Sequence, residues 1–190
     1  MTTNYIRSGS NRSSGSNRSN RRNGPGEQNL RRVHTAKIRV IGLISDTHGL
    51  VRPQALEALR GVDLIIHAGD IGKADVLDAL APIAPLHVIK GNNDRGAWAK
   101  KLPDTKILTV GGVKLFLIHD VHDLAFDPSK RGIAAVISGH SHKPLIVERD
   151  GVLFVNPGSA GPRRFKLPVA VGKLQVTDGG LKAEIIELPI

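Results

Sequence analysis

The sequence predicts an α/β fold in which two mixed β-sheets pack against each other and are flanked by helices, a four-layer α/β/β/α sandwich. From residue 36, apolar runs of strand length alternate with helical patterns, which is typical of parallel strands linked by helices. After Pro103, short apolar runs follow one another without long helical patterns, which favours a largely antiparallel second half. With 190 residues, 40% of them apolar, the chain suits a single core.

Residues 1–35 are predicted to be a disordered basic tail, and residues 36–190 to be the folded domain. The tail mixes Ser, Asn, Gly and Arg, and it holds seven arginines against one acidic residue, Glu27. Such a composition buries too little apolar surface to offset the entropy of ordering. More than half of the net charge of +10 therefore lies outside the domain. A nucleic-acid-binding arm is the alternative, which we do not favour because Tyr5 is its only aromatic residue for base stacking.

The parallel half is predicted from nearly continuous apolar runs rich in Ile and Val, as expected of strands covered on both faces. The predicted strands are residues 37–45, 62–67 and 86–90. One helix is predicted between Pro53, which suits a first helical turn, and Gly61, which stops it. A second helix is predicted over residues 73–81, giving a β-α-β-α-β opening.

The second half is predicted to consist of strands joined by turns and loops. The predicted strands are residues 106–110, 114–119, 134–138, 145–148, 152–156, 169–176 and 181–187. Gly111-Gly112 and Gly179-Gly180 are predicted hairpin turns.

Composition restricts the chemistry and the compartment. The chain has no cysteine, so any metal must be held by nitrogen and oxygen ligands. The first residues lack the apolar segment of a secretory signal, and the longest apolar runs, such as residues 62–68, are far too short to span a bilayer. We therefore expect a cytoplasmic protein without a membrane partner.

Five polar motifs follow the ends of predicted strands. They are Asp46-Thr47-His48, Gly69-Asp70, Gly91-Asn92-Asn93-Asp94, His119 and Gly139-His140-Ser141-His142. Residues i and i+2 of an extended segment point the same way, so Asp46 with His48, and His140 with His142, are predicted to form two chelating forks. Taken singly, a strand-end Asp caps a helix or closes a turn, and a lone His packs or faces solvent. The ordered set predicts a metal site at one rim of the sheets.

This series of motifs resembles the calcineurin-like metallophosphoesterase superfamily, specifically its small bacterial and archaeal phosphodiesterase branch. The resemblance runs from about Lys37 to the C-terminus, and Asn156-Pro157-Gly158-Ser159 with Pro162-Arg163 resembles a late motif of the branch. It implies a phosphodiesterase that hydrolyses a small phosphodiester with a metal-bridging hydroxide. It implies one metal held by Asp46, His48, Asp70 and His142, and a second held by Asp70, Asn92, His119 and His140, with Asp70 bridging.

The implied ligand set has its own chemical consequences. Two carboxylates, four neutral imidazoles and one amide carry a charge of −2, which leaves two divalent cations half compensated and attractive to an anionic ester. Ligands of this kind suit manganese, iron, nickel or zinc, and the resemblance implies Mn²⁺.

The sequence departs from the family pattern at the position of the general acid. Asn93 stands where many members have a His that protonates the leaving oxygen, and an amide is no proton donor at neutral pH. General-acid assistance, often worth ~100-fold or more, is therefore predicted to be missing, and no side chain is assigned as catalytic. Asp120 follows His119 where the family often has glycine. His122 is a candidate substitute acid, although a solvent-facing histidine is the favoured interpretation.

Three arginines are candidate ligands for the substrate phosphate through their guanidinium groups, although exposed arginines are common. They are Arg95, Arg163 and Arg164.

Two other classes of function are weighed against the phosphodiesterase. A non-catalytic binding scaffold, as a retromer subunit of similar fold is understood to be, is disfavoured because the ligand set is intact. A nuclease that holds nucleic acid through the basic tail predicts binding that weakens steeply with salt and is lost when residues 1–35 are deleted. The natural substrate and the oligomeric state are not predicted.

Overall fold

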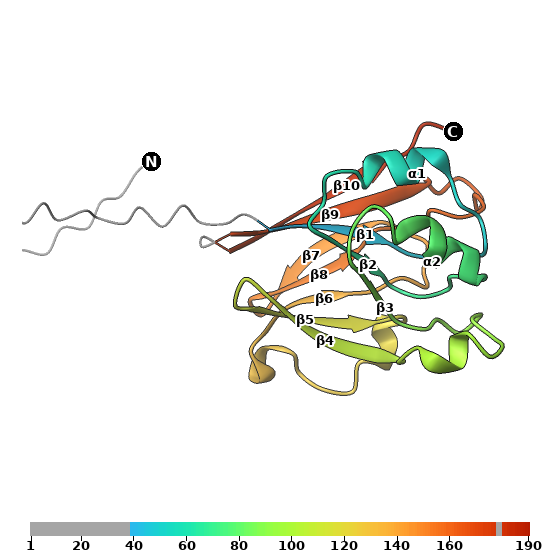
Figure 1. Cartoon of the computed structure of the whole chain (residues 1–190). Coiled ribbons are helices and arrows are strands. Elements are labelled where there is room, and N and C mark those ends of the chain that lie inside the picture. Colours follow the sequence, from blue (N-terminus) through green and yellow to red (C-terminus); the bar gives the residue numbers. More distant parts are fainter. Residues whose placement is uncertain (1–38, 178–179) are drawn as a thin grey trace, which may run out of the picture. The chain divides into compact units, whose positions relative to one another are not determined.

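The computed structural model describes residues 39–177 and 180–190, which form two five-stranded sheets (Figure 1). The strands are β1 (Arg39–Ile44), β2 (Leu64–His67), β3 (Leu86–Val88), β4 (Thr105–Val110), β5 (Val113–Ile118), β6 (Ile133–Ile137), β7 (Leu145–Arg149), β8 (Val152–Asn156), β9 (Ala170–Thr177) and β10 (Gly180–Glu187). The helices are α1 (Pro53–Ala58), α2 (Ala74–Leu80) and the 3-10 helices η1 (Ala99–Lys101), η2 (Val121–Asp123) and η3 (Ser129–Arg131). The predicted tail, residues 1–35, lies outside the described residues, as does Gly179 of the second predicted hairpin turn.

The first sheet has the order β10-β9-β1-β2-β3 and confirms the predicted β-α-β-α-β opening. β1, β2 and β3 are parallel, and their last residues align, because Ile44 pairs with His67 and His67 pairs with Val88. β9 and β10 return from the end of the chain and join this sheet antiparallel to β1. The carboxyl ends of the parallel strands therefore lie at one edge.

Both α-helices cover the outer face of the first sheet (Figure 1). Pro53 opens α1, as predicted, and α1 ends at Ala58, three residues before the predicted stop at Gly61. Buried side chains of the helical region, Ala55 and Val76, pack in one cluster with Ile65 of β2. Among the described residues, no helix is long and apolar enough to cross a membrane.

The second sheet has the order β4-β5-β6-β8-β7. β4 and β5 form the predicted hairpin around Gly111-Gly112, but β6 is parallel to both of its neighbours, β5 and β8. The sheet is therefore less antiparallel than predicted, because the chain between β5 and β6 crosses over the outer face through η2 and η3 instead of turning back. That segment packs Leu124 and Phe126 against the cluster of Phe116 and Val136.

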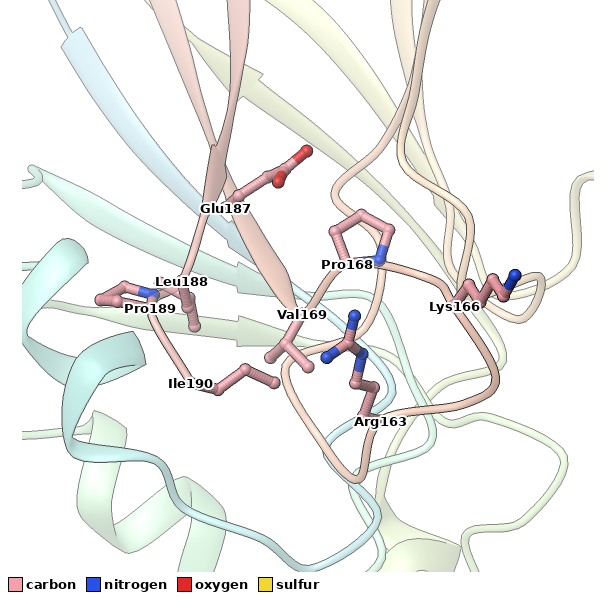
Figure 2. Close-up of a pocket in the computed structure, with 8 residues that line it drawn as sticks. All are labelled: Arg163, Lys166, Pro168, Val169, Glu187, Leu188, Pro189 and Ile190. Carbon is pink, nitrogen blue, oxygen red and sulfur yellow. The ribbon is translucent and has the colours of Figure 1, made fainter.

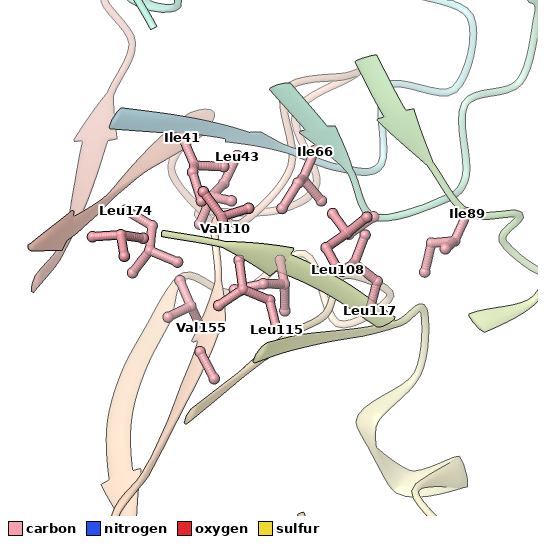
Figure 3. Packing of buried hydrophobic residues seen from close by; sticks show 14 residues of the cluster. Ile41, Leu43, Ile66, Ile89, Leu108, Val110, Leu115, Leu117, Val155 and Leu174 are labelled. Atoms are coloured by element: carbon pink, nitrogen blue, oxygen red, sulfur yellow. The ribbon is translucent and has the colours of Figure 1, made fainter. Parts of the chain in front are cut away.

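The main core lies between the two sheets (Figure 3). Ile41, Leu43 and Ile66 of the first sheet face Leu115 and Leu117 of the second, and all five are fully buried. Burial of this kind contributes about 1.5–3 kcal/mol for each large side chain. The two packed mixed sheets of the prediction are thus confirmed, and their contact holds the strand ends of both sheets together.

Candidate metal centre

All seven predicted ligands lie in loops that leave the carboxyl ends of strands. Asp46 and His48 follow β1, Asp70 follows β2, Asn92 follows β3, His119 follows β5, and His140 and His142 follow β6. The parallel register aligns the ends of β1 to β3, and Leu117 pairs with Ile137 to align β5 with β6. Parallel strands therefore deliver these side chains to one rim of the sandwich.

Five of the seven predicted ligands have left-handed backbone conformations. Their φ angles are 53° for Asp46, 48° for His48, 53° for Asp70, 65° for His140 and 58° for His142. Only two other non-glycine residues with described placement share this region. A side chain in this conformation costs roughly 1–2 kcal/mol, and such conformations persist where surrounding contacts enforce them. Here the loops hold each other, since His48 N donates to Asp70 O over 2.9 Å and Asp46 N donates to Gly69 O over 3.0 Å.

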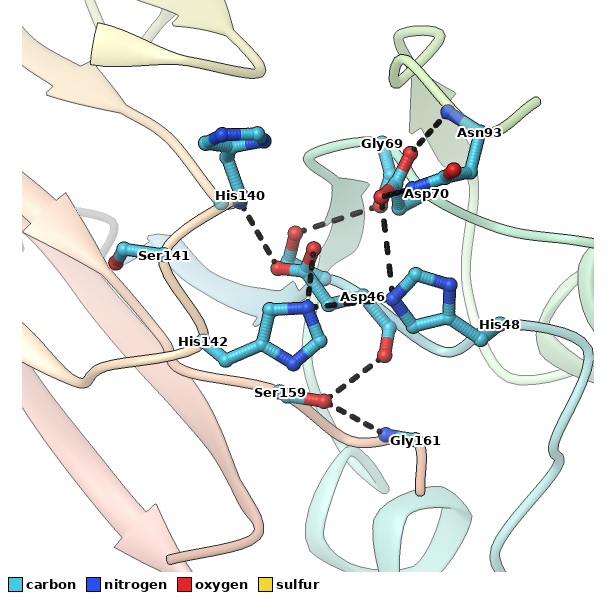
Figure 4. A network of polar contacts seen from close by, with 12 residues as sticks. Asp46, His48, Gly69, Asp70, Asn93, His140, Ser141, His142, Ser159 and Gly161 are labelled. Carbon is cyan, nitrogen blue, oxygen red and sulfur yellow. Dashed lines mark hydrogen bonds and ion pairs between the residues drawn. The ribbon is translucent and has the colours of Figure 1, made fainter. Parts of the chain in front are cut away.

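The first group of donors consists of Asp46, His48 and His142, whose ligand atoms all lie within 4.8 Å of one another (Figure 4). His48 Nε2 and His142 Nε2 are 3.3 Å apart, and His142 Nε2 lies 3.4 Å from Asp46 Oδ1. Asp46 Oδ1 and His142 Nδ1 are buried and have no hydrogen-bond partner among the described residues. The buried Asp46 Oδ1 lies beside His142 Nε2 without a hydrogen bond, and a cation bound between these two atoms would offset the cost of burying that oxygen.

The second group consists of Asn92, His119 and His140. His119 Nδ1 donates to Ala68 O over 2.7 Å, which leaves Nε2 free as a donor atom for metal, 3.2 Å from Asn92 Oδ1. His140 Nδ1 lies 3.0 Å from the same Asn92 oxygen. The predicted His140–His142 fork is wrong, because His140 Nδ1 faces Asn92 of the second group whereas His142 Nε2 lies 3.4 Å from Asp46 Oδ1 of the first.

Asp70 lies between the two groups. Its Oδ1 is 3.5 Å from His119 Nε2, and its Oδ2 is 3.8 Å from His48 Nε2, so each oxygen faces a histidine of a different group. Asp46 also comes within 4.8 Å of donor atoms of Asp70 and His119. Both carboxylates thus reach the space between the groups, and the bridging role of Asp70 stays a prediction.

The pKa values of the two carboxylates, Asp46 and Asp70, are shifted in opposite directions. Burial raises the pKa of Asp46 to about 7. Burial also acts against ionisation of Asp70, but contacts with His119 and Asn93 hold the pKa of Asp70 below its usual range. Burial lowers the pKa of His142 to about 4, and the charge of Arg164 lowers it further. Neutral imidazoles beside carboxylate and amide oxygens form a donor set that fits divalent metal ions.

Several supporting residues were not assigned a role from the sequence. Asn93 donates to both oxygens of Asp70, from its backbone N over 2.8 Å and from Nδ2 over 2.6 Å. Asp94, in the same motif, accepts hydrogen bonds from Gly91 N and Gly72 N, each over 2.8 Å. The motif letters gave the positions of these residues, but Asp70 and Gly72, which they bind, belong to another loop.

The loop after β1 is held from two further sides. His67, at the end of β2, supports it from one side: its Nε2 is 3.0 Å from Thr47 Oγ1, and burial lowers the pKa of His67 to about 3. Ser159, in the late motif, donates to Asp46 O over 2.9 Å (Figure 4). Both contacts fix the backbone that carries Asp46 and His48.

The candidate phosphate-binding arginines lie in different places. Arg164 is exposed; burial lowers the pKa of both His48 and His142, and the nearby charge of Arg164 lowers it further. Arg163 lines a separate cavity of about 420 Å³ with Lys166 and Glu187, next to the C-terminus (Figure 2). Arg95 is exposed on the loop that follows Asp94. Of the three candidate arginines, Arg164 is the one whose charge acts on predicted metal ligands, His48 and His142.

A larger cavity, of about 580 Å³, opens beside the second group. Asn92, His119 and His140 line it together with Asp120 and Asp123. His122, the candidate acid, is not among its lining residues; its side chain is 85% exposed, and its Nδ1 lies 2.8 Å from Asp120 Oδ1. The position of His122 fits a solvent-facing histidine.

Comparison with known proteins adds independent information. The sequence pattern of the calcineurin-like phosphoesterase superfamily domain matches residues 40–179. A probable metallophosphoesterase of Methanothermobacter thermautotrophicus is 35% identical over 159 residues, which cover 77% of this chain and 91% of the relative.

Two solved structures show the same fold. A structure described as an archaeal phosphodiesterase has a TM-score of 0.65 and 25% sequence identity, over 77% of this chain and 99% of that chain. Vps29 of Entamoeba histolytica, solved with Zn²⁺, has a TM-score of 0.59 and 26% identity, over 78% of this chain and 98% of that chain.

Proposed function

This chain belongs to the calcineurin-like phosphoesterase superfamily, and from this premise we propose that it is a metal-dependent phosphodiesterase that uses two divalent metal ions. The observation that carries the proposal is the convergence of nitrogen and oxygen donors from both sheets. Asp46, His48, Asp70, His119 and His142 form two groups whose ligand atoms lie within 4.8 Å of one another, and Asn92 Oδ1 lies 3.2 Å from His119 Nε2 and 3.0 Å from His140 Nδ1. The archaeal phosphodiesterase of the same fold supports the reaction class. Mn²⁺ is the ion proposed, with iron, nickel and zinc as alternatives.

The chain's own residues divide the work of binding. Asp46, His48 and His142, with one oxygen of Asp70, would hold the first ion, and Asn92, His119 and His140, with the other oxygen of Asp70, would hold the second. Two bound ions supply Lewis acidity toward a phosphate ester and lower the pKa of water so that it can attack phosphorus near neutral pH. Asn93 keeps the carboxylate of Asp70 in place through hydrogen bonds to both of its oxygens.

Substrate binding is proposed to involve Arg164. An arginine presents a planar, permanently charged group that matches phosphate oxygens, and the charge of Arg164 already acts on His48 and His142. Arg163 faces the separate cavity with Lys166, and it is a weaker candidate for contact with the same phosphate.

Protonation of the leaving group has no evident donor. The Asn93 amide is engaged by Asp70, and both oxygens of Asp94 accept backbone hydrogen bonds. We therefore expect aryl phosphodiesters, which leave as stable anions, to react far faster than alkyl phosphodiesters. A rate that is independent of leaving-group pKa, with chemistry rate-limiting, would contradict the absence of a general acid.

The experiment that tests the function is hydrolysis of bis(p-nitrophenyl) phosphate by the metal-stripped protein, with and without added Mn²⁺. Asp70→Ala removes the carboxylate that faces both groups, Asn92→Ala removes a donor of the second group only, and Asp150→Ala, in an exposed hairpin turn, is the matched control. Added metal should restore activity in the wild type. Both site variants should lose more activity than the loss of about 10- to 100-fold that follows removal of a hydrogen bond supporting a metal ligand. The control should keep wild-type activity.

Elemental analysis of the same samples gives the metal content. Two ions per chain with metal-dependent turnover would support the proposal. A folded protein that binds two ions but hydrolyses no ester with any divalent metal would refute the phosphodiesterase and favour a binding scaffold of this fold.

A further inference from the structure

Asp120 contacts two histidines with its two carboxylate oxygens. Oδ1 accepts a hydrogen bond from His122 N over 3.0 Å and lies 2.8 Å from His122 Nδ1. Oδ2 lies 3.4 Å from His140 Nε2. The side chain of Asp120 is 25% exposed, so this carboxylate is partly shielded from water. A residue beside His119 in the sequence therefore reaches a second predicted ligand, His140, from another loop.

The two nitrogens of His140 face different partners. Nδ1 lies 3.0 Å from Asn92 Oδ1, in the second group of donors, while Nε2 faces the Asp120 carboxylate. A neutral imidazole carries one proton, and an ionised carboxylate only accepts hydrogen bonds. Both partners only accept hydrogen bonds, so the single proton of a neutral ring can serve one of them. A cation bound at Nδ1 would place that proton on Nε2, where it faces the Asp120 carboxylate.

His140 needs such support more than the other three histidines do. Its side chain is 43% exposed, whereas those of His48, His119 and His142 are 18%, 7% and 4% exposed. Tight packing fixes a buried ring, but a ring with this much solvent exposure can rotate unless a hydrogen bond holds it. His119, by contrast, has both packing and the carbonyl of Ala68.

We propose that Asp120 is a positioning residue that holds His140 in the Nε2–H tautomer and aims its Nδ1 at the second metal site. This inference rests on the proposed function to the extent that it requires two metal sites. His122 then has a structural task, because its N–H groups fix Oδ1 of Asp120 and leave Oδ2 for His140. This role would account for Asp120 at a position where the resembled family often has glycine.

The test is a calorimetric Mn²⁺ titration of the metal-stripped full chain, comparing the wild type with Asp120→Ala. Loss of a supporting carboxylate should weaken one of the two sites by about 10- to 100-fold and leave the other unchanged. Asp120→Asn keeps a carbonyl oxygen that can accept from Nε2–H, so it should recover part of the affinity. Thermal unfolding of the metal-free variants verifies that the fold is intact.

Asp123→Ala is the matched control for charge. Asp123 lies in η2, the short helix that Asp120 precedes, and it lines the same cavity as Asp120. Among the described residues, the side chain of Asp123 makes no hydrogen bond. If general electrostatic attraction of the cation were the cause, Asp123→Ala and Asp120→Asn would lose as much affinity as Asp120→Ala. Equal losses in the three variants would overturn the positioning role.

A double-mutant cycle with His140→Ala identifies the residue through which Asp120 acts. If Asp120 works by holding His140, its replacement should have little further effect once the imidazole is gone. Additive losses would overturn the inference. A wild-type protein that binds fewer than two ions would refute the two-metal proposal itself, whereas two ions bound equally well by wild type and Asp120→Ala would refute only the role of Asp120.

Discussion

The two ends of the sheets contain left-handed backbone for different reasons. At the hairpin ends, where β4 meets β5, β7 meets β8 and β9 meets β10, glycines occupy most of these conformations among the described residues: Gly111, Gly112, Gly151 and Gly180, with Asp150 as the exception among them. At the opposite ends, where the candidate metal centre lies, Gly49, Gly69 and Gly72 share this conformation with five of the predicted ligands, all of them aspartates or histidines. The ligand end therefore places functional side chains in a conformation that the hairpin end fills mainly with glycine.

This difference separates folding requirements from functional ones. A hairpin turn needs only the backbone geometry, and glycine provides it without steric strain. At the metal centre a side chain must project from the same geometry, so each ligand in that conformation destabilises the metal-free fold by roughly 1–2 kcal/mol. The buried, unpartnered oxygen of Asp46 adds an electrostatic cost. The ligand end is therefore predicted to be less stable than the hairpin end until cations bind.

The largest expected effect concerns the charge of Asp46. Its pKa is raised from 3.8 to about 7 in the folded chain, so the folded state holds the proton more tightly than the unfolded state. The stability that this proton contributes is present below pH 4 and is lost as the pH rises to 7, by about 1.4 kcal/mol per pH unit and about 4 kcal/mol in total. Asp46→Asn imitates the protonated group and should lack this loss.

Denaturant unfolding of the metal-free proteins between pH 4 and 7 measures this effect as a difference between variant and wild type. The difference isolates Asp46, since buried histidines such as His67 act in the opposite direction in both proteins. Asp150→Asn, at the exposed hairpin end, should follow the wild type. Parallel curves for Asp46→Asn and the wild type would show that Asp46 ionises without penalty and would weaken the contrast between the two ends.

The next effect in size comes from the packing of Gly91. A methyl group at this position would overlap the backbone N and Oδ1 of Asp70, whereas a methyl at Gly112 would meet no atom within 4 Å. Gly91→Ala should therefore displace Asp70, lower stability by about 1–3 kcal/mol and impair metal binding. Chemical denaturation and Mn²⁺ titration are the measurements, with Gly112→Ala as the control that keeps full metal affinity. Unaltered metal binding in Gly91→Ala would mean that the loops can accommodate the added methyl group without displacing Asp70 from the site.

The sequence predicted features that depend on neighbouring residues in the chain and missed those that depend on contacts between distant segments. Strands and helices were predicted because apolar periodicity is a local signal, and the seven candidate ligands were found because they lie in short motifs. The parallel pairing of β6 with β5 and β8 depends on where the intervening chain crosses, which no local pattern specifies. The roles of Asn93 and Asp120 could not be predicted either, because their partners, Asp70 and His140, come from other loops.

The smallest effect tests backbone strain alone. His140→Ala and His140→Gly both remove the imidazole, and they differ only by a Cβ atom at a position with φ of 65°. In the metal-free protein the glycine variant should be more stable than the alanine variant by about 1 kcal/mol, and Gly112→Ala, at φ of 82°, should lose a similar amount. Both site variants should bind the second ion weakly. Equal stability of the two His140 variants, with the expected loss at Gly112, would show that the ligand loop relaxes when metal is absent, and strain would then arise only as the cations bind.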